Sequence, residues 1–351
     1  MPRMLVATAP RKAAIVEYQD RKIAANEVMV EVEFASPKHG SEVADFRSES
    51  PLIDEFYDQD WHLILPRSAG EKKGVEFGSW NLGNMWVGKI VVKGEDVKDY
   101  SIGERVCSYG GIRETHIINA IGNDRLLKVP TGVSWKSAVC YDPAQFAFSG
   151  IRDGNVRPGD YIAVIGLGAI GLMAVQLGKK IGARPVIGVD PIAIRREAAL
   201  NSGADYVLDP GECDIGLEIK RLTGKLGADC IIETSGSAGA LQSALRGLAY
   251  GGTVSYVAWA REFAGGINFG REAHYNYGRV VFSRAASEPS PDFPRWDRKR
   301  IEKTCWNLIL DGSLSGDDIV DPVVNFEESP SAYCKYVDTN PELSIKLGVA
   351  F

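Results

Sequence analysis

The feature that most constrains this chain is a glycine-rich turn, Gly-Leu-Gly-Ala-Ile-Gly at residues 166–171. The apolar run before it, residues 161–165, has the composition of a buried strand, and the apolar residues after it recur at helical spacing. Asp190 ends the next apolar run, about 20 residues beyond the turn. A strand, this turn, a helix and then an acidic residue form the fingerprint of a dinucleotide-binding site.

Each glycine of the turn has its own task in such a site. Gly166 permits a tight turn, Gly168 leaves room for a pyrophosphate, and Gly171 lets the helix pack closely on the strand. The phosphates would meet the positive end of the helix dipole. We therefore expect the cofactor to contact the whole turn, which comprises Gly166, Leu167, Gly168, Ala169, Ile170 and Gly171.

Asp190 also bears on the choice of nucleotide. Its carboxylate can accept both ribose hydroxyls of NAD, whereas the 2′-phosphate of NADP would lie beside a like charge. Two unit charges about 4 Å apart repel by about 4 kcal/mol at an effective dielectric of about 20, an upper limit for a partly solvated site. Arg195 and Arg196 follow closely and could soften this preference. We expect NAD as the cofactor, with NADP less favoured, and we place Arg195 among the residues that contact it.

From about residue 158 the pattern alternates between short apolar runs and helical spacing, which predicts βαβ units and a parallel sheet. Two of these runs end in residues 233–236 (Glu-Thr-Ser-Gly) and 256–258 (Tyr-Val-Ala). Ligands of such folds bind at the carboxyl ends of the strands. Ser235, Val257 and Ala258 are therefore further candidates for cofactor contact.

The first 145 residues favour β structure instead. Residues 29–34, 87–93 and 105–109 read as strands, and their Gly and Pro punctuation suggests a small barrel or sandwich. Residues 46–82 show no clear periodicity but hold several aromatic side chains, among them Tyr57, Trp61 and Trp80. These rings could stack on a carbohydrate-like ring, or pack a loop onto the domain or onto a partner subunit.

Composition narrows the function classes. The chain has 46 acidic and 40 basic residues and a net charge of −6, which argues against a general nucleic-acid binder. No apolar run is long enough to span a membrane, and the opening residues lack the continuous apolar stretch of a secretory signal. The six cysteines form no Cys-x-x-Cys pair, so reduced thiols in a cytoplasmic protein are expected.

Nearly the whole chain resembles the medium-chain dehydrogenase/reductase superfamily, and most of all its sorbitol- and alcohol-dehydrogenase branch. The resemblance rests on residues 100–106 (YSIGERV), residues 156–160 (VRPGD), the dinucleotide turn, and residues 248–252 (LAYGG) before a strand. It implies an α/β fold in which a GroES-like, β-rich catalytic domain accompanies a Rossmann domain with a doubly wound parallel sheet.

The resemblance also implies how the chain is divided. The expected catalytic domain spans residues 1–148, the NAD-binding domain spans residues 149–289, and residues 290–351 return to the catalytic domain. A homodimer or homotetramer acting on a small molecule is implied as well.

Most members of that branch use a catalytic zinc, and this chain departs from their ligand motifs. The position of the early cysteine ligand falls on His39, the Gly-His-Glu motif falls on residues 83–85 (Gly-Asn-Met), and the later acidic ligand falls on Asp142. Zinc needs three good nitrogen, sulfur or oxygen donors, whereas Asn84 is a poor donor and Met85 a soft, weak one. The four-cysteine lobe of a structural zinc is absent too. We therefore expect a member that has lost both zincs.

Without a metal, a side chain must take the proton that alcohol oxidation releases. His39 is the first candidate, because neutral imidazole titrates near working pH, and Lys38 is the second. Asn84 could hold the substrate oxygen by a hydrogen bond. Ser41 and Glu42 could relay protons or anchor the ribose of the nicotinamide.

These expectations converge on a zinc-independent, NAD-dependent oxidoreductase that acts on a secondary alcohol such as a sugar, polyol or cyclitol. Two alternatives stay open at this point. One is a zinc-free reductase of quinone or enone substrates. Such reductases usually use NADPH, which Asp190 disfavours. The other is a nucleotide-binding protein without turnover, which the loss of zinc ligands permits.

Overall fold

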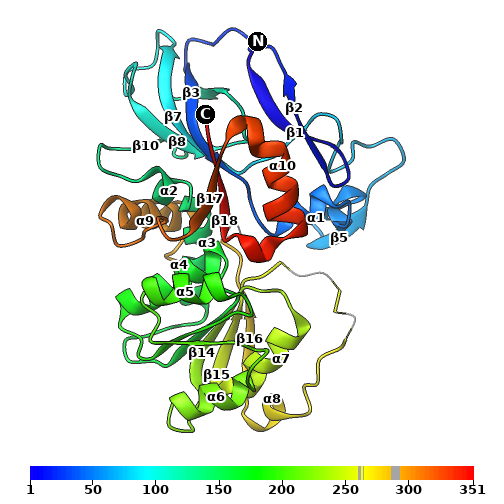
Figure 1. Ribbon diagram of the computed structural model, residues 1–351, viewed down its shortest axis with the longest axis vertical. Helices are drawn as coiled ribbons and strands as arrows, with labels where there is room; N and C mark the ends of the chain where they lie inside the picture. The colour runs from blue at the N-terminus through cyan, green and yellow to red at the C-terminus, as the bar shows by residue number, and fades with distance from the viewer. Residues whose placement is uncertain (260–261, 264, 286–292) are drawn as a thin grey trace. The chain divides into compact units, whose positions relative to one another are not determined.

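A computed structural model describes residues 1–259, 262–263, 265–285 and 293–351 (Figure 1). The chain divides into two compact units, one formed by Met1–Thr131 with Val320–Phe351 and the other by Gly132–Ile319. The resemblance predicts domain boundaries after residues 148 and 289, which differ from the boundaries of these two units. The second predicted boundary lies outside the described residues. They remain predictions.

The second unit is built on a six-stranded sheet in which neighbouring strands run parallel (Figure 1). Its order β13-β12-β11-β14-β15-β16 is, in chain order, 3-2-1-4-5-6, the order of doubly wound dinucleotide-binding folds. The strands are β11 (Ile162–Ile165), β12 (Val186–Val189), β13 (Tyr206–Leu208), β14 (Ala228–Glu233), β15 (Leu248–Tyr256) and β16 (Arg279–Phe282). The α/β fold class predicted from the sequence is therefore confirmed.

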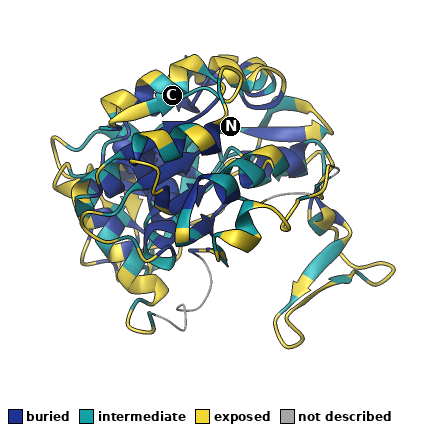
Figure 2. Ribbon diagram, turned by 90° about the horizontal axis from the view of Figure 1, so that it is seen from below, coloured by how far each residue is buried: buried dark blue, intermediate teal, exposed yellow. Residues whose placement is uncertain are grey.

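Helices cover both faces of this sheet, because alternate strand residues point to opposite sides. Ala163 and Ile165 of β11 join a buried cluster with residues of α6 and α7, whereas Ile162 meets α4 at Gly178. The helices of this unit are α2 (Trp135–Ala138), α3 (Tyr141–Asp153), α4 (Ala169–Ile181), α5 (Ala193–Asn201), α6 (Ile215–Leu222), α7 (Ala238–Gly247), α8 (Glu272–Tyr275) and α9 (Arg298–Leu310). In Figure 2 the sheet strands are mostly buried and the outer helix faces exposed.

The first unit holds a three-stranded sheet of order β2-β1-β6 and a seven-stranded sheet of order β10-β8-β7-β3-β18-β17, with β9 also paired to β3. The C-terminal strand β18 pairs antiparallel with β3, so the end of the chain completes the sheet that its beginning starts. The strands are β1 (Arg3–Ala9), β2 (Lys12–Glu17), β3 (Glu27–Ser36), β6 (Trp80–Asn81), β7 (Met85–Lys93), β8 (Arg105–Tyr109), β9 (Thr115–Asn119), β10 (Leu127–Lys128), β17 (Val320–Asn325) and β18 (Lys346–Ala350).

The segment without clear periodicity, residues 46–82, folds partly into a separate hairpin of β4 (Glu55–Asp58) and β5 (Leu63–Pro66), which follows the short helices α1 (Ser41–Phe46) and η1 (Pro51–Ile53). Tyr57 and Trp61 are exposed there, and the Tyr57 hydroxyl lies 3.1 Å from His62 Nδ1. Near the C-terminus a helical stretch over residues 329–339 is divided. It begins as α10 (Ser329–Ala332) and continues as a π-helical segment, η3 (Tyr333–Thr339).

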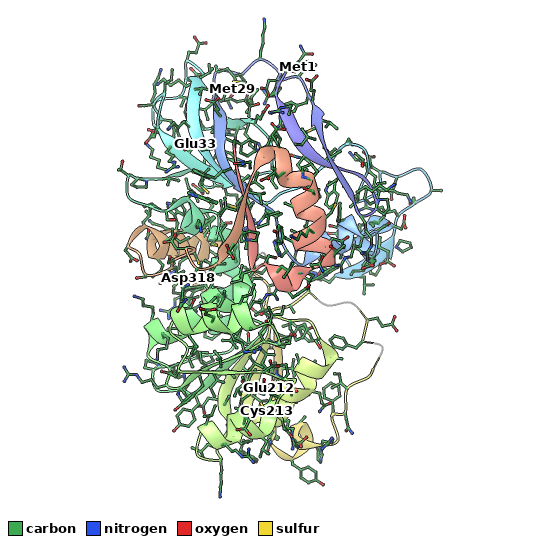
Figure 3. All side chains as sticks on the ribbon, in the orientation of Figure 1. Met1, Met29, Glu33, Glu212, Cys213 and Asp318 are labelled. Carbon is green, nitrogen blue, oxygen red and sulfur yellow. The ribbon has the colours of Figure 1, made fainter. Side chains whose placement is uncertain are left out.

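All six cysteines lie among the described residues, and none of them is in a disulfide. Cys213 lies beside Glu212 in the loop before α6 (Figure 3). Burial, together with the acidic groups around it, raises the pKa of its thiol, which disfavours the thiolate form. Within the described part of the chain, no helix has the length and apolar character needed to cross a membrane.

His116 of β9 is a structural histidine. Its ring stacks on Trp86 with centroids 4.7 Å apart, and its Nε2 lies 3.0 Å from the Gly111 carbonyl oxygen, to which it donates. Burial in the core, with a smaller contribution from Arg113, lowers the pKa of His116 to about 3.

This depressed pKa predicts how the protein responds to acid. The imidazole stays neutral in the folded protein but takes a proton in the unfolded chain below about pH 6.5, so acidification from there toward pH 3 favours unfolding. The variant His116→Gln should be less stable at pH 7, because it loses the ring stacking. Its deficit in free energy of unfolding should shrink as the pH falls below about 6.5, as urea titrations at several pH values would show. A deficit that stays constant with pH would contradict this account.

Candidate active site

The glycine turn predicted from the sequence forms the link between β11 and α4. Gly166 has φ = +90°, which favours glycine, and a side chain there would meet the Ser235 backbone nitrogen at 2.8 Å. A Cβ at Gly171 would lie 1.9 Å from the Gly166 carbonyl oxygen. Thr234 Oγ1 donates to that same oxygen at 2.6 Å. The turn is therefore closely packed on its protein side.

Gly168 differs from its neighbours, because a Cβ added there meets no atom within 4 Å among the described residues. It is the N-cap of α4, a helix of 13 residues that continues through Ala169 and Ile170. The space over Gly168 and the amide end of a long helix form an anion cradle that a side chain would fill. These residues fit a dinucleotide pyrophosphate.

Asp190 lies at the end of β12 and is only 3% exposed. Its Oδ2 accepts a hydrogen bond from the Leu167 backbone at 2.8 Å, and its Oδ1 accepts one from the Ile192 backbone at 2.9 Å. Each carboxylate oxygen has a second lone pair, so capacity for ribose hydroxyls remains. The Asp190 carboxylate thus also fixes the glycine turn, because it accepts the hydrogen bond that the Leu167 backbone amide donates.

The two arginines after Asp190 differ in position. Arg195 Nη1 lies 3.9 Å from Asp190 Oδ2. Arg196 pairs with Asp209 at 2.8 Å and donates to the Asp190 backbone oxygen at 2.7 Å. Arg195 is therefore the one beside the carboxylate that would meet the adenosine ribose.

Glu233, at the end of β14, joins the other two predicted cofactor segments. It is fully buried, and its carboxylate accepts hydrogen bonds from the Ser235 backbone at 2.8 Å, from the Ser235 hydroxyl, and from the Gly236 backbone at 3.2 Å. Its main-chain oxygen accepts from Val257 at 2.8 Å and from Ala258 at 3.2 Å. Burial raises the pKa of this carboxyl, and the hydrogen bonds from Ser235 oppose that shift. The role of Glu233 in joining these segments is not predicted from the sequence, although an acidic residue at the end of an apolar strand indicates such a role.

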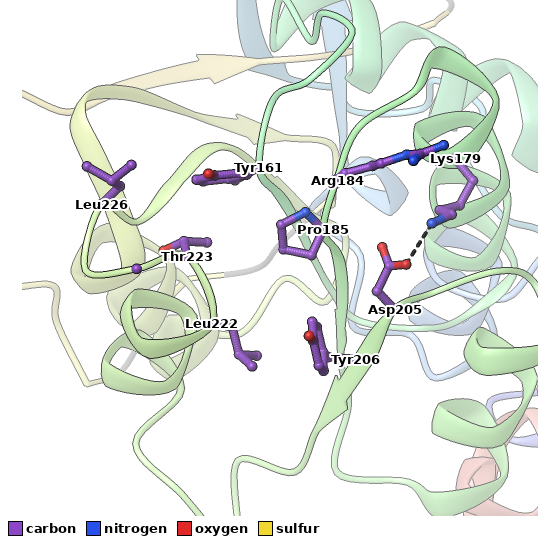
Figure 4. Close-up of a pocket in the computed structure, with 10 residues that line it drawn as sticks. Tyr161, Lys179, Arg184, Pro185, Asp205, Tyr206, Leu222, Thr223 and Leu226 are labelled. Carbon is purple, nitrogen blue, oxygen red and sulfur yellow. Dashed lines mark hydrogen bonds and ion pairs between the residues drawn. The ribbon is translucent and has the colours of Figure 1, made fainter.

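A surface depression of about 630 Å³ lies at the opposite edge of the same sheet, near the amino ends of the strands (Figure 4). Tyr161 and Pro185 line it, and an ion pair of 2.7 Å between Lys179 and Asp205 crosses its rim. Parallel sheets bind their ligands at the carboxyl ends of the strands, so this depression is not the nucleotide site.

In the first unit, Lys38 and His39 lie between the end of β3 and the start of α1, and both are partly buried. Strand β18 holds this loop in two places: Lys346 Nζ donates to the Pro37 oxygen at 2.7 Å, and the Leu347 backbone amide donates to His39 Nε2 at 3.2 Å. Because Nε2 accepts this bond, the neutral ring carries its proton on Nδ1. His39 is therefore arranged as a hydrogen-bond donor through Nδ1.

Asn84 lies directly before β7. Its backbone amide donates to the Ser36 oxygen at 3.0 Å, and its backbone oxygen accepts from Gly110 at 2.9 Å. Its side-chain nitrogen Nδ2 is buried and has no hydrogen-bond partner among the described residues. An orphaned buried donor costs about 1–3 kcal/mol, which favours a ligand as its missing partner.

Ser41 is the first residue of α1 and is partly buried, whereas the adjacent Glu42 is almost fully buried. Glu42 Oε1 accepts from the Tyr333 hydroxyl at 2.7 Å, and Oε2 accepts from the Gly83 backbone at 3.0 Å. Burial raises the pKa of Glu42 to about 7, with the Tyr333 hydrogen bond as the largest opposing effect. Sequence analysis missed Tyr333 and Lys346, because nothing near them in the chain marks them.

The residues at the zinc-ligand positions do not fit a zinc ion. His39 Nε2 is engaged by the Leu347 amide, and Met85 is fully buried. An amide nitrogen such as Asn84 Nδ2 has no lone pair to donate to a metal. Asp142 is a buried residue in the first turn of α3. Across the described ranges, no group of three or more His, Cys, Asp or Glu residues could hold a metal ion.

A doubly wound sheet with open space over Gly168 is typical of dinucleotide-binding enzymes, and the first unit offers imidazole, amine and amide groups. Comparisons with known proteins agree. The family model described as "Zinc-binding dehydrogenase" matches residues 169–294. D-guloside 3-dehydrogenase of Escherichia coli strain K12 is 61% identical over 349 residues, covering 99% of this chain and 100% of that protein. The chain therefore belongs to the medium-chain dehydrogenase/reductase superfamily, in its alcohol and polyol dehydrogenase branch.

More distant relatives fit the same family. Sorbitol dehydrogenase of Bacillus subtilis strain 168 is 35% identical over 134 residues, covering 38% of each chain. The crystal structure of 2R,3R-butanediol dehydrogenase from Bacillus subtilis superposes with a TM-score of 0.77 at 18% identity and covers 100% of both chains. At that identity the likeness shows the fold alone.

Proposed function

We propose that this protein oxidises the 3-hydroxyl of a D-guloside or a closely related hexoside to a ketone, with NAD as the hydride acceptor and without zinc. The observation that carries this proposal is the 61% identity to D-guloside 3-dehydrogenase over 99% of the chain. A hexoside is a sugar with secondary hydroxyls, which is the substrate class that the sequence predicts.

The second unit binds the nucleotide in this proposal. A bound NAD would supply the hydride acceptor for C3 of the sugar. The backbone of Gly168, Ala169 and Ile170 holds the pyrophosphate, and Asp190 and Arg195 hold the adenosine ribose. Ser235, Val257 and Ala258 line the part of the site toward the nicotinamide. The like-charge repulsion at Asp190 supports NAD over NADP.

The first unit handles the sugar hydroxyl. Asn84 Nδ2, a buried donor that has no partner among the described residues, donates a hydrogen bond to the reacting oxygen and so stabilises negative charge as it develops there. In this proposal His39, with its proton on Nδ1, acts as a second donor. Lys38 then takes the hydroxyl proton, which reverses the order expected from the sequence. Two donors and one base provide what a Lewis acid supplies in zinc-dependent relatives.

Oligomer and location complete the proposal. We expect a homodimer or homotetramer in the cytoplasm, which binds a small-molecule substrate and neither nucleic acid nor membrane. Light scattering on the purified protein gives the mass of the assembly directly.

Formation of NADH with a panel of methyl hexosides tests the function. We expect the highest kcat/KM for the D-guloside, no activity with its 3-deoxy analogue, and a 3-keto product identifiable by NMR. Absence of turnover with every hexoside, despite tight NAD binding, would point to a nucleotide-binding protein without catalysis. NADPH-dependent reduction of quinones or enones would point to the reductase branch instead.

Removal of metals tests the zinc-free mechanism. Because no step runs through a metal, dialysis against a chelator should leave kcat within about twofold of the untreated enzyme, and elemental analysis should find less than about 0.1 zinc per chain. A zinc-dependent sorbitol dehydrogenase treated in parallel is the control that must lose activity. One zinc per chain, with activity lost on its removal and restored on its return, would contradict the proposal.

A further inference from the structure

The C-terminal segment η3 is attached to α1, the short helix that follows His39, at both ends of that helix. Tyr333 donates to Glu42 at 2.7 Å, and its ring meets Phe46 edge-on with centroids 4.8 Å apart. Arg47, the C-cap of α1, donates through Nε to Asp338 at 2.5 Å. A helix of six residues has too few hydrogen bonds to be stable alone. Its position, and that of the loop before it, therefore depends on η3.

Glu42 extends this attachment to the loop before β7, which carries Asn84. While one carboxyl oxygen accepts from Tyr333, the other accepts from the backbone of Gly83 at 3.0 Å, next to Asn84. The Lys38 backbone also donates to this carboxyl. One buried side chain thus connects the segment that carries Lys38 and His39 with the segment that carries Asn84.

The connection is enclosed by protein. Tyr333 is 0% exposed, Glu42 is 7% exposed, and the ammonium of Lys346, which is 3% exposed, attracts the Glu42 carboxyl. Loss of any one hydrogen bond leaves another buried polar group without a partner, so the arrangement holds a single geometry. No water or substrate is needed to explain it.

We propose that Glu42 and Tyr333 are a positioning pair, which sets where Lys38, His39 and Asn84 lie relative to one another and so governs the rate of the chemical step. This inference rests on the proposed function for its kinetic consequence. It differs from the sequence-based expectation for Glu42, in which that carboxyl relays a proton or anchors ribose.

The variant Tyr333→Phe removes one hydroxyl and keeps the ring that packs on Phe46. We expect kcat to fall about tenfold, because a small displacement of catalytic groups has a large effect on rate, while KM and NAD affinity stay within about twofold. Amide hydrogen exchange should become faster in residues 36–46 and 82–85. The matched control is Tyr336→Phe, which removes a hydroxyl from the same π-helical segment. That hydroxyl contacts Lys335 and not Glu42.

A second pair of variants separates positioning from proton relay. Glu42→Gln keeps the hydrogen bonds with Gly83 and Tyr333, because the amide oxygen can accept from Gly83 while the amide nitrogen donates to Tyr333 Oη. Glu42→Ala removes these two bonds and the one from the Lys38 backbone. A positioning role predicts that Glu42→Gln retains kcat within about threefold of the wild type and that Glu42→Ala loses tenfold or more. Equal losses in the two variants would overturn the proposal in favour of a relay.

Two further outcomes are decisive. If Tyr333→Phe matches Tyr336→Phe in both kcat and exchange, the pair does not position the loops and the inference is wrong. If Tyr333→Phe does not fold, the comparison of Glu42→Gln with Glu42→Ala decides. If the wild-type enzyme oxidises no hexoside, the proposed function fails, and hydrogen exchange in the same four variants still tests whether Glu42 and Tyr333 fix the two loops.

Discussion

Replacement of Gly168 by valine should abolish nucleotide binding while leaving the fold intact. In the structure a Cβ at this position meets no described atom within 4 Å, and φ is −72°, so the fold tolerates a side chain. The same side chain would fill the space over the amide end of α4 in which the pyrophosphate is expected. We expect the Kd for NADH, measured by fluorescence, to rise at least about 100-fold with a change in Tm of less than about 2 °C.

Gly171→Val is the matched control, because it adds the same side chain at a position of the turn that has no space for it. A Cβ at Gly171 would lie 1.9 Å from a backbone oxygen, so this variant should fail to fold rather than fold without binding. NADH affinity retained in Gly168→Val would contradict the assignment of the nucleotide site. A Gly171→Val protein with unchanged stability would contradict the packing of the turn.

The second large effect is expected at Lys38. If its amine takes the hydroxyl proton, Lys38→Met should lower kcat by about 10²–10⁴-fold, with NADH affinity unchanged, because general-base catalysis contributes that much. His39→Gln should lower kcat less, by about tenfold to 100-fold, since it removes a hydrogen-bond donor and not the base.

Chemical rescue distinguishes the two residues independently. An added primary amine should restore part of the rate of Lys38→Met. The reverse ranking, with the larger loss in His39→Gln and no rescue of Lys38→Met, would assign the proton to the imidazole. Lys335→Met, in η3 and on the surface, is the control for loss of a lysine charge.

Local patterns explain why the nucleotide site could be predicted from the sequence. Each determinant, from Gly166 to Asp190, lies within one βαβ unit, so strand, turn and helix each leave a mark in consecutive residues. The expected strand at residues 105–109 also matches β8. The Asp190 carboxylate also accepts a hydrogen bond from the Leu167 amide, and no local sequence pattern predicts this second role.

The proposed substrate side of the site is predicted only in part, for a related reason. Lys38, His39 and Asn84 are candidates because of a family resemblance, whereas the groups that bind the loop of Lys38 and His39 come from the end of the chain. The Tyr333–Glu42 bond joins residues 291 positions apart, and the Leu347–His39 bond joins residues 308 apart. The missed strands β1 and β2 and helix α3 show the same limit, since their placement is decided by tertiary pairing.

The most direct test of the central claim uses a methyl D-guloside that carries deuterium at C3. The account predicts that the enzyme transfers this deuterium to NAD, so that mass spectrometry finds singly deuterated NADH together with an unlabelled 3-keto sugar. Reduced cofactor without the label would place the oxidised carbon elsewhere on the sugar. Absence of any reduced cofactor, with the wild-type enzyme folded and bound to NAD, would contradict the claim that this chain is a sugar 3-dehydrogenase.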